Sequence, residues 1–125
     1  MDVRTSSLAA ALIRQGWESA HSITAHLDGL SDATPNPDQE AAPYDKYIPI
    51  NQQRIKRIRK SLAKQGLSPA LLAAVRRVKA GTKMLVLNEF WCGDGAQILP
   101  VHEAMELISE GKLEVRALMR DEHVD

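Results

Sequence analysis

The most reactive side chain in this sequence is the thiol of Cys92, the single cysteine among 125 residues. Cys92 follows a short apolar run and precedes a helical pattern, so we expect it at the N-terminus of a helix. Backbone N–H groups and the helix dipole favour an anion at that position. They therefore favour the thiolate, which is the nucleophilic form of a cysteine. The alternative interpretation is a small, buried apolar residue without a redox role.

The residues near Cys92 limit the chemistry that it can perform. Asp94 is interpreted as a helix N-cap or an acid of the first helical turn rather than a proton-transfer group, and its charge opposes the thiolate. Trp91 can shield one side of the sulfur. Pro100 lies inside the predicted helix, where it removes one backbone hydrogen bond. His102 is more than two helical turns from Cys92, so a Cys-His catalytic pair is not expected.

Metal and cofactor binding are not predicted. A single cysteine provides no cluster of thiolates unless a dimer brings two copies of Cys92 together. His21 and His26 are five residues apart, which is not the spacing of two metal ligands on one helix face, so both are interpreted as surface histidines. We therefore expect no metal site and no cofactor.

The bulk properties of the chain are typical of a soluble globular protein in a reducing compartment. One cysteine cannot form a disulfide within its own chain, which fits the cytoplasm. No apolar run reaches the roughly 18 residues of a membrane span. The apolar stretch from Leu8 to Ile13 lacks a strongly basic segment before it, so no secretory signal is predicted. We therefore expect a cytoplasmic protein that does not enter a membrane.

The elements on either side of Cys92 must position it. Residues 84–90 form a short apolar run, which is typical of a strand buried on both faces of a parallel sheet. Residues 94–110 have helical periodicity, and residues 113–119 alternate as a second strand does. Strand, helix and strand in this order predict a right-handed βαβ unit with parallel strands. The predicted fold class is therefore α/β.

The pattern at the beginning of the chain predicts a helical region followed by a linker. Residues 5–30 have helical periodicity in two parts. Residues 31–49 contain four prolines, which favour a loop. We therefore predict an N-terminal helical region with a Pro-rich linker, 1–43, and a second domain, 44–125.

Residues 51–83 carry ten basic residues and no acidic residue. Asn51 is predicted to cap a helix that ends near residue 64, and Ser68 to cap one that ends near residue 79. The charge predicts either a basic layer against the acidic segments that flank it or contact with an anionic partner. No aromatic residue lies in this segment, so a platform for base stacking is missing and nucleic acid is not the expected partner.

Trp-Cys-Gly opens a predicted helix after an apolar strand, and a proline follows eight residues beyond the cysteine. This pattern resembles the active-site segment of the thioredoxin superfamily. Residues 44–125 resemble, more narrowly, a bacterial group of thioredoxin-like proteins with a Trp-Cys-Gly-Asp turn. The quoted features of that group correspond here to Asn51 to Arg57, Trp91 to Asp94, Ala96 to Pro100 and Arg120 to Glu122.

The resemblance implies an incomplete thioredoxin-like fold. The chain ends before the family's cis-proline loop, two antiparallel strands and final helix. In dithiol members the resolving cysteine occupies the position of Gly95, so an external thiol such as glutathione would have to resolve a mixed disulfide here. The implied site consists of catalytic Cys92 with the motif residues Trp91, Gly93, Asp94, Gly95 and Pro100.

Two functions of different classes are compatible with this sequence. The first is a thioredoxin-like protein with weak or monothiol redox activity at Cys92, whose partners are protein disulfides or glutathione. The second is a non-catalytic interaction module that keeps the fold without the chemistry. A homodimer that pairs unpaired sheet edges is its simplest form. Whether the chain is an enzyme is left open by the sequence.

Overall fold

The structure is a computed structural model that describes residues 3–119. In chain order its elements are α1 (Val3–Ser19), β1 (His21–Ser22), α2 (Ile23–Asp32), the 3₁₀ helix η1 (Asp45–Tyr47), α3 (Ile48–Gln65), α4 (Pro69–Arg76), β2 (Thr82–Leu87), α5 (Gly93–Ile108) and β3 (Leu113–Leu118). None of the described helices is long and apolar enough to cross a membrane. Arg120 to Glu122, which the resemblance includes, lie outside the described residues.

The three strands form one mixed sheet in the order β1-β3-β2. β2 and β3 are parallel, from Thr82 opposite Leu113 to Leu87 opposite Leu118, and α5 connects them. The predicted α/β class and its strand-helix-strand unit are therefore confirmed. β1 pairs antiparallel with β3 and adds a strand that the sequence did not predict. β2 ends at residue 87 instead of 90 because the next residues turn toward the helices.

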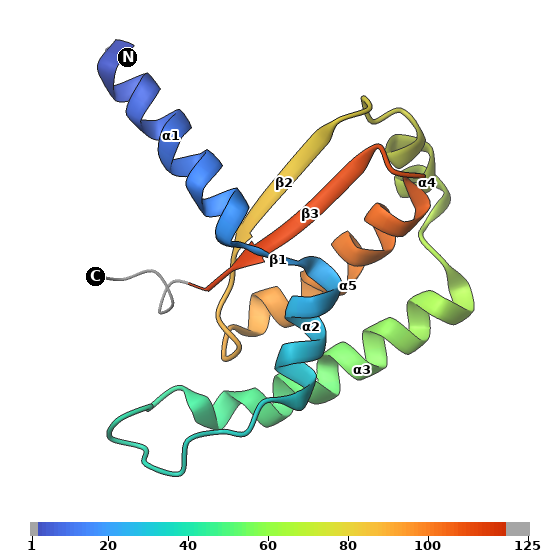
Figure 1. Ribbon diagram of the computed structural model, residues 1–125. Coiled ribbons are helices and arrows are strands. Elements are labelled where there is room, and N and C mark those ends of the chain that lie inside the picture. The colour runs from blue at the N-terminus through green and yellow to red at the C-terminus, as the bar shows by residue number, and fades with distance from the viewer. Residues whose placement is uncertain (1–2, 120–125) are drawn as a thin grey trace.

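The helices α2 and α5 cover one face of this sheet, and α3 lies farther out against them (Figure 1). The periodicity of α2 and the alternation of β3 both direct apolar side chains into the space between sheet and helices. Burial of these side chains is the main source of stability for such a layered arrangement. The core consists of Ile23, Leu27, Leu30, Ile55, Ala96, Leu99, Leu113 and Val115, all at most 3% exposed.

The opposite face of the sheet is covered only in part. The C-terminal end of α1 packs there, where Gly16 comes close to Leu85 and Leu118. The ring of Trp17 contacts the guanidinium of Arg116, whose carbon lies 4.3 Å from the ring centroid. Leu87, at the end of β2, is 69% exposed. The prediction of a strand buried on both faces is therefore wrong at this position, because nothing among the described residues covers it.

The boundaries of α3 and α4 correct one predicted cap and confirm the other. α3 begins at Ile48 rather than after Asn51, because Pro49 fits the first helical turn with its fixed φ and its missing N–H. The prediction of Asn51 as a cap is wrong. Ser68 does cap α4, since its hydroxyl oxygen accepts a hydrogen bond of 3.3 Å from the backbone N–H of Leu71. α4 then ends at Arg76, earlier than predicted.

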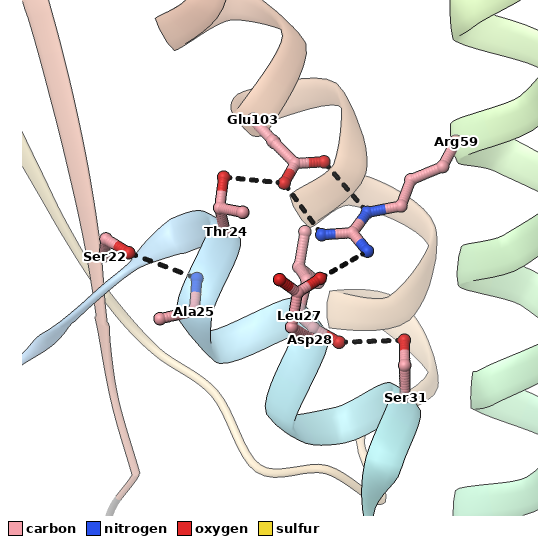
Figure 2. A network of polar contacts seen from close by, with 8 residues as sticks. All are labelled: Ser22, Thr24, Ala25, Leu27, Asp28, Ser31, Arg59 and Glu103. Carbon is pink, nitrogen blue, oxygen red and sulfur yellow. Dashed lines mark hydrogen bonds and ion pairs between the residues drawn. The ribbon is translucent and has the colours of Figure 1, made fainter.

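A polar cluster fixes α3 against both α2 and α5 (Figure 2). The guanidinium of Arg59 donates to both carboxylate oxygens of Glu103, at 2.9 and 2.8 Å. It also donates to Asp28 at 2.9 Å, and the hydroxyl of Thr24 donates to Glu103 at 2.8 Å. Burial acts to lower the pKa of Arg59, but the hydrogen bonds to Glu103 and Asp28 outweigh it and raise that pKa. For Arg59, the predicted contact of the basic segment with acidic flanks is therefore confirmed.

We predict that Arg59→Ala lowers the free energy of unfolding by about 1–3 kcal/mol, because it leaves the largely buried carboxylate of Glu103 without its bidentate hydrogen-bond donor. Arg59→Lys should recover only part of this loss, since a lysine cannot donate two parallel bonds. Urea denaturation monitored by circular dichroism measures both effects. Arg57→Ala, at an exposed position on the same helix, is the control and should change stability by less than about 0.5 kcal/mol. Equal losses for the two alanine variants would contradict this prediction.

Candidate active site

Cys92 stands at the point where the chain leaves β2 and enters α5. It is the N-cap residue of that helix, with an extended backbone (φ −77°, ψ 114°), and its side chain makes no capping hydrogen bond. Its N–H donates to the carbonyl of Glu89 at 3.0 Å, and its carbonyl accepts from the N–H of Ala96 at 3.2 Å. The residue is half-buried. The predicted position at a helix N-terminus is confirmed, whereas the reactivity of the thiol stays a prediction.

The first turn of α5 presents backbone donors and one acid beside this thiol. The first N–H groups of a helix have no acceptor within it, so those of Gly93, Asp94 and Gly95 are available to an anion. Asp94 lies exposed in this first turn, as predicted for a first-turn acid. Pro100 lies inside α5 and is buried, and the helix continues through it.

A buried amide from α3 holds the turn that precedes Cys92. The side chain of Asn51 is fully buried, and its Nδ2 donates to the carbonyl of Phe90 at 3.0 Å. Its Oδ1 accepts from Nη1 of Arg54 at 3.1 Å. A Cβ built on Gly93 would lie only 2.9 Å from that same Nη1, so the guanidinium lies directly over the first turn of α5. The site therefore has a fixed cation next to the helix N-terminus.

A second buried amide follows directly after β2. Asn88 is 5% exposed, and its Oδ1 lies 2.9 Å from Nε2 of His26, which is itself 3% exposed. The interpretation of His26 as a surface residue is wrong. His26 follows Ile23 by three residues in α2, and this spacing places it on the same buried helix face as Leu27 and Leu30. A Cβ built on Gly95 would overlap Nδ2 of Asn88 and lie 2.7 Å from its Cγ. Neither buried partner was expected from the sequence.

Trp91 lies in the turn between β2 and α5, directly before Cys92, and packs against the loop that precedes α3. Its ring packs on Tyr44, with ring centroids 4.9 Å apart and planes at 33°. A cavity of about 380 Å³ lies next to this pair, between the loop of residues 33–45 and the turn. Phe90 and Trp91 line it, whereas Cys92 does not. Pro100 instead lines a separate cavity of about 310 Å³ between α3 and α5. Of the site residues predicted from the sequence, those from Trp91 to Gly95 therefore lie together at the start of α5, whereas Pro100 lies apart from them inside the helix.

The geometry can be compared with known proteins. A family model described as thioredoxin matches residues 38–125 of the chain. The chain belongs to this thioredoxin family. A comparison with curated proteins and one with solved structures gave no significant match. The predicted thioredoxin resemblance is confirmed, whereas the predicted domain boundary at residue 44 stays a prediction.

Within residues 3–119 of this thioredoxin-family chain, no three His, Cys, Asp or Glu side chains gather in a group that could hold a metal ion. The donors near Cys92 are amides and a guanidinium, which are hydrogen-bond donors to anions rather than metal ligands. The arrangement of these donors therefore suits a sulfur anion or another anionic group.

His102 lies farther along α5 in the same thioredoxin-family chain and is half-buried. Its Nδ1 is buried, and no described residue offers it a hydrogen bond. Burial lowers the pKa of this histidine from its ordinary value of 6.5, because the charged ring loses solvation.

We predict that His102 makes folding pH-dependent in mildly acidic solution. The folded pKa is below the unfolded one, so the unfolded chain binds the proton first. Stability should therefore be complete above about pH 6.5 and should fall as the pH drops below that value. His102→Gln should flatten this fall in urea unfolding measured from about pH 8 to about pH 5, whereas the control Gln97→Ala, at an exposed position of the same helix, should not. An identical slope in the parent chain and the His102 variant would contradict the prediction.

Proposed function

We propose that this thioredoxin-family chain performs thiol–disulfide exchange with Cys92 as its single redox thiol. The observation that supports it most is the combination at the start of α5: a half-buried thiol without a capping bond, with the guanidinium of Arg54 over the neighbouring Gly93. Free backbone donors and a fixed cation both favour a sulfur anion. The negative charge of Asp94 works against this effect but is exposed to solvent, which screens it.

The proposed reaction proceeds in two exchanges. The thiolate of Cys92 attacks one sulfur of a disulfide, forms a mixed disulfide with that half and releases the other half as a thiolate. An external thiolate then attacks the mixed disulfide, joins the bound half in a new disulfide and releases the thiolate of Cys92. Electrons balance without a further oxidant or reductant, since one disulfide and one thiol are exchanged for another pair.

The partners proposed for this reaction are protein disulfides and glutathione. Glutathione carries two carboxylates, and a guanidinium beside the sulfur is suited to bind one of them. A pool of reduced glutathione is a property of the cytoplasm, so we propose that compartment as the place of action.

We predict that Cys92 in the folded chain reacts with iodoacetamide faster at neutral pH than free cysteine does. Arg54→Gln should slow this reaction about 2- to 5-fold, because the variant removes the cation beside the first turn of α5. Arg57→Gln, exposed on the same helix, is the matched control and should leave the rate unchanged. Cys92→Ser should abolish labelling and glutathione adduct formation. A folded-state rate no higher than that of free cysteine would refute the proposal.

One observation favours a second candidate, an interaction module. Within residues 3–119, β2 pairs with β3 on one side and with no strand on the other. The N–H of Thr82 donates to the carbonyl of Lys112, and the N–H of Asn88 donates to the carbonyl of Leu118. Both N–H groups therefore point toward β3. Alternation then directs the N–H groups of Lys83, Leu85 and Leu87 toward the free edge. A second copy could pair there in antiparallel fashion around a two-fold axis.

For this candidate we predict a concentration-dependent dimer in sedimentation velocity. Leu87→Pro should abolish the dimer, since it removes an outward donor without removing any bond between β2 and β3. Leu87→Ala keeps the donor and is the control. A chain that stays monomeric at high micromolar concentration would exclude edge pairing and leave the exchange reaction as the remaining candidate.

A further inference from the structure

Asn88 fills the volume into which any side chain at position 95 would extend. A Cβ on Gly95 would overlap its Nδ2 and approach its Cγ to 2.7 Å and its Oδ1 to 3.2 Å. Real Cβ atoms do not approach other heavy atoms so closely, and the amide is not free to rotate away. It is 5% exposed, its Oδ1 is bonded to His26, and its own N–H donates to the carbonyl of Leu118 at 3.0 Å.

Position 95 is three residues after Cys92, which is where the second thiol of a Cys-X-X-Cys pair would lie. Side chains three apart on a helix have Cβ atoms about 5–6 Å apart, and a disulfide brings them to about 4 Å. A group that fills the volume at position 95 therefore occupies the place from which a second thiol would reach the sulfur of Cys92.

His26 determines which end of the amide faces this volume. A carbonyl oxygen can only accept, so the bond of 2.9 Å requires Nε2 of His26 to donate to Oδ1 of Asn88. The NH₂ end is thereby directed toward Gly95. Within residues 3–119 this Nδ2 donates no hydrogen bond, although its side chain is nine-tenths buried. This NH₂ group is not among the fully buried unpaired atoms of the described residues, so it keeps some contact with solvent and can donate to an anion at the site.

We propose that the side chain of Asn88 takes the place of the resolving thiol: it excludes a side chain at position 95, and its Nδ2 supplies a hydrogen bond to the sulfur of Cys92 once that sulfur is a thiolate. Asn88 is a positioning residue, and His26 orients it from α2. The steric part stands on the geometry alone, whereas the donor part rests on the proposed exchange reaction at Cys92. The site then has a single thiol because Asn88 fills the volume of the second one. Introducing a cysteine at position 95 alone does not restore a dithiol site.

The steric part is tested by reintroducing the second thiol. Gly95→Cys and the double variant Asn88→Ala/Gly95→Cys are incubated with oxidised glutathione and analysed by intact mass. In the double variant Cys92 attacks glutathione disulfide and releases one glutathione, and the introduced thiolate then displaces the second, which leaves an intramolecular disulfide. We expect the single variant to retain the glutathione adduct. Equal closure in both variants would overturn the steric part.

Gly95→Cys can unfold the chain because of the overlap that it creates, so a second measurement keeps the test decisive. The stabilities of Gly95→Ala, Asn88→Ala and the double alanine variant form a double-mutant cycle in urea. We expect the double variant to be more stable than the sum of the two single losses predicts, since removing the amide relieves the overlap. Strict additivity would show that the two positions do not share a volume. Gln97→Ala, at an exposed position of α5, is the control for an unrelated change in this helix.

The donor part is tested by the pH profile of Cys92 alkylation. Asn88→Asp replaces the donor by a negative charge and should slow the reaction at neutral pH about tenfold and move the profile to higher pH. Asn88→Ala should move the profile in the same direction by less. A profile that neither variant moves would overturn the donor part. An unreactive Cys92 in the parent chain would instead refute the exchange reaction, and the mass and stability results would still decide the steric part.

Discussion

The short turn between β2 and α5 is the constraint on which the rest of the site depends. Five residues connect the end of the strand to the start of the helix, and two buried amides hold them. Asn51 binds the carbonyl of Phe90 from α3, and Asn88 is bonded to His26 of α2. Buried polar groups are expensive unless they are paired, so each of these bonds admits one arrangement of the turn.

The packing of the helices transmits this constraint to the whole fold. α2 places His26 beneath the turn because its neighbour Leu27 is fully buried against the sheet and α5. α3 places Asn51 there because Ile55, one turn later, is buried in the same core. The bonds of Arg59 to Glu103 then connect α3 to the middle of α5. The contact between these helices is thus fixed at two points, by Asn51 near the start of α5 and by Arg59 farther along it. The position of Cys92 is thus determined by three helices and not only by the one that it caps.

Those features of the fold that have a local cause were accessible from the sequence. The apolar run before Cys92, the periodicity after it and the pattern of residues 113–119 predict a βαβ unit, and Ser68 before Pro69 predicts the start of α4. Each of these signals lies within a few residues of the structure that it specifies. The family match over residues 38–125 agrees with the same reading.

The residues that hold the turn have no such local signal. Asn51 and Phe90 are 39 positions apart, and His26 and Asn88 are 62 apart, so no pattern within one element relates them. An asparagine before an apolar helix is predicted as a cap on local grounds, but here it is used one turn inside the helix for a distant carbonyl. His26 lies on the buried face of α2 together with Ile23, Leu27 and Leu30, and its partner Asn88 is what makes burial of the imidazole possible.

The absence of a side chain at Gly93 and at Gly95 has the same explanation, which is the close approach of a residue from another element. Each lacks a side chain where a polar group from another part of the fold comes close, Arg54 at the first and Asn88 at the second. Apart from Asp94, the first turn of α5 therefore adds only backbone N–H groups next to Cys92, and the other polar side chains come from α3 and from the end of β2. A site assembled in this way can exchange one donor for another by a substitution far away in the sequence. Its chemistry is consequently a property of the tertiary packing, which a four-residue motif cannot specify.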